Sequence, residues 1–121
     1  MEEQPGVIVK NLAEAQTEAI GQINRQVLFQ PATDGNKNLK FAVAMAPPGA
    51  KSAVHSHPGD EVALTLSGSA TLRVGDREYP VQKGTAVLIR PGVEHSVENS
   101  GDEDWVVVSA YCDDCFLLNK G

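Results

Sequence analysis

The stretch "GAKSAVHSHPGDEVALTLSG", residues 49–68, places two histidines and a glutamate at the start of an alternating run. His55 and His57 are separated by one residue, so on an extended segment both imidazoles project to the same side. The Pro-Gly pair at 58–59 then turns the chain, which lets Glu61 face the two histidines from the next strand. Two imidazoles and one carboxylate suit a first-row divalent ion, and this set is associated with non-haem Fe(II). The stretch therefore predicts a metal site.

The run "EVALTLS", residues 61–67, divides its side chains between two faces. One face carries the glutamate with small and polar residues, and we expect it to form the wall of a cavity: Glu61, Ala63, Thr65 and Ser67. The other face carries three branched apolar residues: Val62, Leu64 and Leu66. Because exposed apolar patches usually mark contact surfaces, we expect a second sheet or a second subunit to cover this face, and hence a homodimer.

Turn signals recur along the chain roughly every eight to twelve residues or less, which is typical of an all-β sandwich or barrel. Examples are "PPGA" at 47–50, "SGS" at 67–69, "VGDRE" at 74–78 and "RPG" at 90–92. The runs between the turns predict strands at 39–46, 61–67, 70–74, 85–90 and 105–111. One segment, 11–21, contains good helix formers, and it is either a short helix that ends at Gly21 or irregular.

Composition excludes several classes of protein. A chain of 121 residues predicts one domain with one core, large enough to fold without disulfides. The formal net charge is −6 and the ten basic residues form no cluster, so we expect no nucleic-acid partner. The N-terminal apolar run is too short for a signal-peptide core, and no later stretch approaches the length of a membrane span. We therefore expect a cytoplasmic protein without a membrane partner.

The third histidine, His95, is the expected fourth ligand, and it lies in "RPGVEHSVEN", residues 90–99. Together with residues 49–68, this segment resembles the two sequence motifs of the cupins. The first motif has its glycines, histidines and glutamate at Gly49, His55, His57, Glu61 and Gly68, and the second has its fixed residues at Gly84, Gly92, His95 and Asn99. One position departs, because Arg90 stands where the family has proline, so the turn before His95 is expected to differ slightly. We interpret the four glycines as backbone positions with positive φ or close packing, not as ligand contacts.

The resemblance implies an all-β fold, a single-domain cupin β-barrel or RmlC-like jelly roll (double-stranded β-helix), over residues 36–121. Residues 1–35 match nothing specific, and we expect them to form a strand or short helix that can serve as a dimer arm. The resemblance also implies one divalent metal ion per chain, Fe, Mn, Ni or Zn, with the ligands His55, His57, Glu61 and His95.

Three functions stay open for a site that takes a small-molecule ligand or substrate. The metal can serve an oxygenase, or a Lewis-acid isomerase or lyase, or the protein can bind a sugar or small acid as a sensor or store without turnover. An enzyme acting on a small oxygen-rich metabolite is favoured, and an oxygenase comes first because metal and dioxygen would carry the difficult chemistry. No catalytic residue can be assigned. With every histidine committed, Thr65, Tyr111 or an acidic residue would have to contact the substrate and transfer protons.

The segment "YCDDCF", residues 111–116, has the cysteine spacing of a redox pair or of half a zinc site. A structural zinc site would need two more ligands, and a thioredoxin-type pair would need a strand-to-helix setting that this chain lacks. We therefore expect Cys112 and Cys115 to be ordinary thiols, with a disulfide or a metal-scavenging role as the less favoured alternatives.

Overall fold

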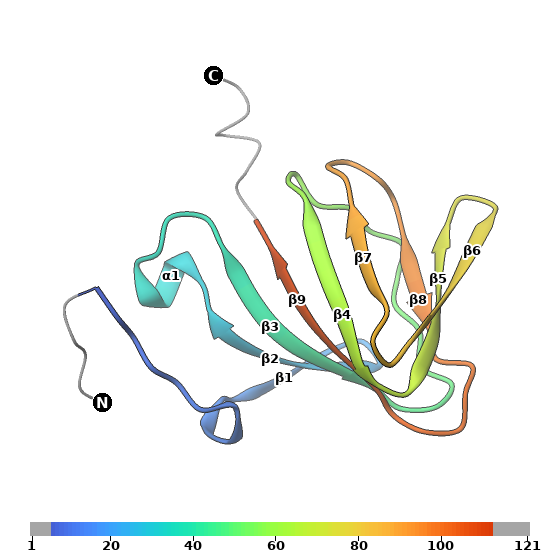
Figure 1. Ribbon diagram of the computed structural model, residues 1–121, viewed down its shortest axis with the longest axis horizontal. Helices are drawn as coiled ribbons and strands as arrows, with labels where there is room; N and C mark the ends of the chain where they lie inside the picture. Colours follow the sequence, from blue (N-terminus) through green and yellow to red (C-terminus); the bar gives the residue numbers. More distant parts are fainter. Residues whose placement is uncertain (1–5, 113–121) are drawn as a thin grey trace.

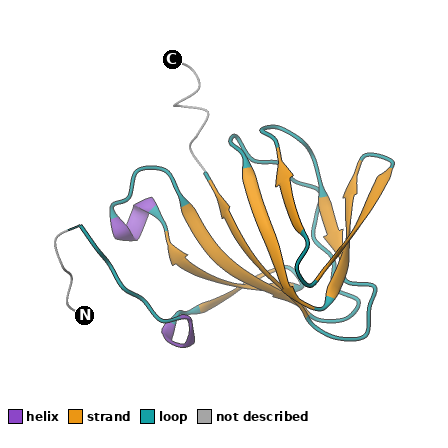
Figure 2. Ribbon diagram, viewed as in Figure 1, coloured by secondary structure: helices purple, strands orange, loops and turns teal. Residues whose placement is uncertain are grey.

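Two antiparallel sheets make up the part of the chain that the computed structural model describes, residues 6–112 (Figure 1, Figure 2). The larger sheet has the strand order β1-β2-β3-β9-β4-β7 and the smaller has the order β6-β5-β8. The strands are β1 (Thr17–Ile20), β2 (Ile23–Phe29), β3 (Lys40–Ala46), β4 (Glu61–Ser67), β5 (Ser69–Val74), β6 (Arg77–Gln82), β7 (Ala86–Ile89), β8 (Ser96–Glu98) and β9 (Trp105–Tyr111). Two short helices, η1 (Leu12–Glu14) and α1 (Pro31–Asp34), precede β1 and β3. The predicted all-β fold is confirmed.

The five predicted strands are present as β3, β4, β5, β7 and β9, with ends that differ by at most one residue. A helix over residues 11–21 is absent, because this segment forms only the three-residue 3-10 helix η1 and then β1. β1 pairs along its length with β2, and these sheet hydrogen bonds outweigh the helix propensity of its residues. β1 and β2 extend the larger sheet beyond β3, and the predicted domain boundary at residue 35 stays a prediction.

Strand β6 begins inside the segment 74–78 that was expected to be a turn. The reversal occupies only Gly75 and Asp76, and Arg77 already pairs with Val74. β6 contains Pro80, which cannot donate a ladder hydrogen bond, but β6 lies at the edge of its sheet, where proline is tolerated. Within residues 6–112, no helix is long and apolar enough to cross a membrane.

The core lies between the two sheets. Its buried members are Ala46, Ala50, Ala70, Leu72, Val81, Ile89, Trp105 and Val107. The four motif glycines all have positive φ, as predicted. At Gly68 the constraint is also steric, because a Cβ atom there would lie 2.1 Å from the carbonyl oxygen of Asp104. A side chain at this position would push β4 away from the loop before β9.

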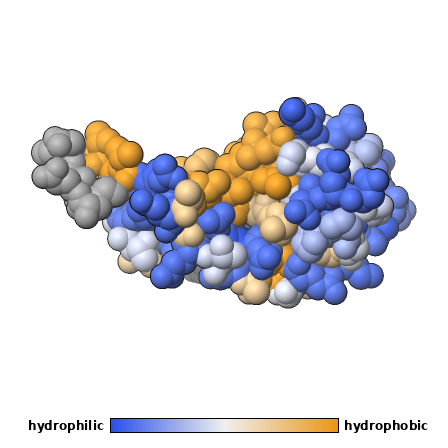
Figure 3. Space-filling model, turned by 90° about the horizontal axis from the view of Figure 1, so that it is seen from below, coloured by the Kyte–Doolittle hydropathy of each residue, from blue (hydrophilic) through white to orange (hydrophobic). Residues whose placement is uncertain are grey.

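The predicted division of β4 into two faces is confirmed over most of its length. Alternate residues, Glu61, Ala63 and Thr65, line an internal cavity. Val62, Leu64 and Leu66 lie on the outer face and are 49%, 39% and 43% exposed, beside Leu88 of β7 at 52%. Hydrophobic surface gathers near the middle of the molecule in Figure 3. Ser67 departs from the prediction: the register with β9 shifts between Thr65 and Ser67, and Ser67 is exposed.

Candidate metal centre

His55 and His95 are far apart in sequence but lie directly opposite each other in the fold. They form an isolated antiparallel bridge, in which each backbone N–H donates to the other residue's carbonyl, at 2.9 and 2.8 Å. Residues opposite each other in an antiparallel pair project to the same side. Nearby, the N–H of Gly92 donates to the carbonyl of His57 at 2.9 Å, which ties the turn before His95 to the second histidine.

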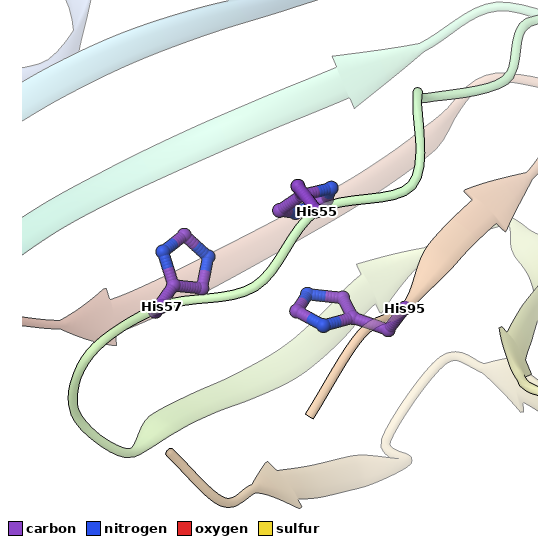
Figure 4. A group of neighbouring side chains, drawn as sticks. All are labelled: His55, His57 and His95. Atoms are coloured by element: carbon purple, nitrogen blue, oxygen red, sulfur yellow. The ribbon is translucent and has the colours of Figure 1, made fainter. Parts of the chain in front are cut away.

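The three imidazoles gather in one place (Figure 4). Each offers one ring nitrogen, and these three atoms lie within 4.8 Å of one another. The ring centroid of His55 lies 4.3 Å from that of His95 and 5.3 Å from that of His57. Three converging imidazoles at this spacing can hold a metal ion, so the expected histidine cluster is present.

Backbone carbonyls determine which nitrogen of two of the rings is available. Nδ1 of His55 lies 2.9 Å from the carbonyl oxygen of Ala53, and Nδ1 of His95 lies 2.9 Å from that of Val93. A carbonyl oxygen only accepts hydrogen bonds, so Nδ1 carries the proton in each neutral ring and Nε2 presents a lone pair. Hydrogen bonds of this kind orient the histidines of metal sites.

Glu61 lies beside two of the histidines. Its Oε1 is 3.2 Å from Nε2 of His57 and 3.4 Å from Nε2 of His95. This oxygen is buried, yet among the described residues it accepts no well-aligned hydrogen bond. A buried carboxylate oxygen beside two imidazole nitrogens is an arrangement that a cation would satisfy. The donor set therefore fits a divalent metal ion.

The charges of this group are strongly coupled. Burial raises the pKa of Glu61, but the adjacent imidazoles of His57 and His95 outweigh burial and lower that pKa to about 2. Burial lowers the pKa of His95, but Glu61 and the carbonyl of Val93 outweigh it and raise that pKa above its ordinary value. Without a cation, the carboxylate thus favours the protonated form of His95, and a proton competes with metal for its nitrogen.

The histidines open onto a cavity of about 400 Å³. Both residues named from sequence as candidate substrate contacts lie in its wall. The Tyr111 ring packs against His57 with 4.6 Å between centroids, and the Thr65 hydroxyl accepts a hydrogen bond from Nε1 of Trp105 at 3.0 Å. The cavity brings these residues together, while their contact with a substrate stays a prediction.

Two residues of this region were not assigned a role from sequence. Arg25 of β2 lines the cavity and donates from Nη1 to the Tyr111 hydroxyl at 2.7 Å. No signal pointed to it, because β2 was not among the predicted strands. Asn99 is 1% exposed, and its side-chain amide donates to the carbonyls of Ala46 and Glu103, both at 2.8 Å. Its role is to hold the loops next to the core, and the match to the second motif was the signal for it.

Two further expectations from sequence concern the turn at Arg90 and the cysteines. The turn at Arg90 is closed by a hydrogen bond from the N–H of Val93 to the Arg90 carbonyl at 3.3 Å.

Cys112 is buried directly after β9 and is disulfide-bonded, which corrects the expectation of an ordinary thiol at this position. A disulfide was the less favoured alternative because cysteine spacing alone does not predict oxidation. Cys115 lies outside the described residues.

A family model described as "Cupin domain" matches residues 42–111. The chain belongs to the cupin family. This cupin is 28% identical over 85 residues to the oxalate-binding protein of Thermotoga maritima, a match that covers 69% of this chain and 70% of that protein. It is 24% identical over 112 residues to auxin-binding protein 1 of Arabidopsis thaliana, covering 84% of this chain and 57% of that protein.

Solved structures agree with the fold of this cupin. One is the crystal structure of a predicted oxalate decarboxylase from Thermotoga maritima, with a TM-score of 0.77 and 24% identity. The match covers 87% of this chain and 98% of that one. At this level of identity the likeness shows the fold alone, and it confirms the predicted jelly roll.

Proposed function

We propose that this cupin is a metal-dependent enzyme that acts on a small oxygen-rich metabolite. In this proposal His55, His57, His95 and Glu61 hold one divalent ion per chain. The observation that carries the proposal is the buried Oε1 of Glu61, which faces the Nε2 atoms of His57 and His95 and accepts no well-aligned hydrogen bond among the described residues. A buried carboxylate oxygen beside two imidazole nitrogens is stable only with protons or a cation among them.

The ion would supply dioxygen chemistry if it is iron, or Lewis-acid polarisation of a bound oxygen if it is manganese, nickel or zinc. The protein's own groups would position the reactants. The carbonyls of Ala53 and Val93 hold His55 and His95 in one tautomer and orientation. Tyr111, packed on His57, would contact the substrate from the side of β9. Thr65 would contact it from β4.

An oxygenase is favoured over an isomerase or lyase. Redox-neutral chemistry of these kinds needs a general base within hydrogen-bond reach of the substrate. The described cavity wall contains one carboxylate, that of Glu61, and it already faces the imidazoles. Much of the remaining wall is apolar, with residues such as Leu72, Val81 and Ile89. Such a wall protects a reactive centre from water but transfers no protons.

A non-catalytic binding protein is the second candidate. The names of the Thermotoga oxalate-binding protein and of the Arabidopsis auxin-binding protein support it, because both name a small molecule that is bound. The same cavity and cluster would then capture a small acid or sugar without turnover. The enzyme would convert its ligand and the binding protein would not, but both would bind it in the same cavity.

We further propose that the chain is a cytoplasmic homodimer. The exposed apolar residues on the outer face of β4 and β7 support the dimer. The disulfide at Cys112 counts against a reducing compartment, so cell fractionation together with thiol labelling is the appropriate test.

The function is tested by elemental analysis of untagged protein. We expect about one equivalent of metal per chain in the wild type, and a sharp loss in His57→Ala and in His95→Ala with the fold retained. Arg73→Gln is the control, because Arg73 is exposed and pairs with Glu78 and Glu98, outside the cavity. Iron in the wild type leads to oxygen-consumption assays with small acids and diols. Full metal content in both histidine variants would contradict the site.

A further inference from the structure

Arg25 brings a permanent positive charge to the cavity wall on the side of Tyr111. Its Nη1 donates to the Tyr111 hydroxyl at 2.7 Å, and the Tyr111 ring lies 4.6 Å from the His57 ring, centroid to centroid. All three side chains line the same cavity. The cation is therefore separated from the histidine cluster by the phenol ring of one tyrosine.

Small side chains give Arg25 the room to extend along the cavity. Arg25 lies opposite Ala44 in the pairing of β2 with β3, and Ala44 lies opposite Val107 of β9. Tyr111 is further along β9, with Ser109 between it and Val107 on the cavity side. A large residue at Ala44 or Ser109 would obstruct the path from Arg25 to Tyr111, whereas alanine and serine leave it open.

The present counter-ion of Arg25 is held by only one of its oxygens. Nε of Arg25 donates to Oε1 of Glu18 at 2.9 Å, and Nη2 donates to the same oxygen. The guanidinium edge can donate to both oxygens of a carboxylate at once, but here both nitrogens contact a single oxygen of Glu18. The Glu18 side chain is 53% exposed while that of Arg25 is 22% exposed. Exposed ion pairs are weak, so an incoming carboxylate can replace Glu18 at little cost.

We propose that Arg25 binds the carboxylate of a small organic acid, which replaces Glu18, while an oxygen at the other end of the acid faces the three histidines. A hydroxy acid, an oxo acid or a short dicarboxylic acid has this pair of groups. The inference rests on the proposed function for the histidine end of the ligand. The Arg25 end stands on the contacts of Arg25, Tyr111 and Glu18 alone.

The single tryptophan of the chain provides the measurement, because Trp105 lines the same cavity. Its fluorescence is followed while zinc-loaded protein is titrated with lactate and succinate, and separately with the neutral lactamide and succinamide. We expect the acids to bind at least about tenfold more tightly than the amides, since hydrogen bonds to a charged partner are the stronger ones.

Four variants assign that preference to Arg25. Arg25→Gln should lose the preference for acids while its zinc content stays unchanged, and Arg25→Lys should retain part of it. Glu18→Gln should bind the acids more tightly than the wild type, because it removes the competing carboxylate. Arg73→Gln removes an ion-paired arginine outside the cavity and should leave the preference unchanged.

Three results would overturn the inference. They are equal binding of acids and amides by the wild type, no binding of either acid at millimolar concentration, and an unchanged preference in Arg25→Gln. Circular dichroism of Arg25→Gln and Arg25→Lys shows that the fold is intact. A wild type that takes up no zinc would instead contradict the proposed function, and the acid preference is then measured on the metal-free protein, where Arg25 must still produce it.

Discussion

The inner and outer faces of β4 differ completely although their residues alternate along one strand. Glu61, Ala63 and Thr65 face the cavity, where small and polar side chains leave space beside the histidines. Val62 and Leu64, their neighbours in sequence, point outward, where Val62 pairs with Leu88 in an apolar surface. The comparison shows that the hollow interior is produced by residue size at alternate positions. It also shows that the apolar side chains on the outer face of β4 and β7 are left exposed by the fold of a single chain.

The largest expected effect is the difference in stability lost when a buried leucine and an outward-facing leucine are each replaced by alanine. Leu72 is 5% exposed and packs in the core, whereas Leu64 is 39% exposed on the outer face. We expect Leu72→Ala to lower the free energy of unfolding by about 2–5 kcal/mol, because it removes a buried side chain and leaves a void. The same substitution at Leu64 should cost about 1 kcal/mol or less. Urea denaturation measures both, and equal losses would mean that the outer face is as well packed as the core.

The next effect concerns metal at the inner face and its dependence on pH. Metal binding needs unprotonated nitrogens, and the pKa of His95 is raised above 6.5, since Glu61 and the Val93 carbonyl outweigh burial. As the pH falls, His95 is therefore protonated earlier than a free imidazole. Zinc affinity, measured by competition with a chelator, should fall at least about a hundredfold from pH ~8 to pH ~5.

The role of Glu61 in that pH dependence can be isolated. The pKa of Glu61 is about 2, so this carboxylate stays ionised over the whole range and does not itself cause the loss of metal. Glu61→Gln removes a group that raises the pKa of His95, so zinc affinity should be lower at pH ~8 but should decline at a lower pH than in the wild type. Affinity that does not change with pH in the wild type would mean that the imidazoles do not bind the metal.

The smallest effect on stability is expected where a charge replaces an apolar residue on the outer face. Leu64→Lys should convert the proposed dimer to a monomer in light-scattering measurements, while the unfolding free energy of the monomer changes by about 1 kcal/mol or less. The matched control is Lys83→Leu, which changes an exposed position outside the outer apolar surface. A wild type that is monomeric at all concentrations would show that this face is not covered by a second copy.

Much of the fold could be predicted because turns and alternation are local. The five strands that were predicted have clear apolar alternation between glycine- or proline-containing turns. The positions of β1 and β2 were not predicted, although a strand or short helix was expected within residues 1–35. Their residues have mixed character, and their strand conformation depends on pairing, of β1 with β2 and of β2 with β3. β6 was missed because "DRE" has the composition of a turn, yet it pairs with β5 through its whole length. In these segments, pairing with a neighbouring strand decides the structure, and the residue pattern of the segment alone does not reveal it.

The candidate site divides in the same way. The spacing of His55, His57 and Glu61, together with the position of His95, is enough to identify the cluster. These residues are close in sequence or lie in a recognisable motif. Arg25 could not be identified, because nothing in "INRQVLF" distinguishes it from a surface arginine. Its significance comes from Tyr111, 86 positions away in the chain.

The sequence by itself determined the class of fold, the family and the histidine cluster, because alternation, turn residues and motif spacing act over a few residues. Only the tertiary structure decided that His55 and His95 pair through their backbones, that Oε1 of Glu61 is buried beside two imidazoles, and that Arg25 reaches the same cavity. The physical reason is that burial, pKa shifts and ion pairing depend on distances between segments. Those distances exist only once the two sheets have packed.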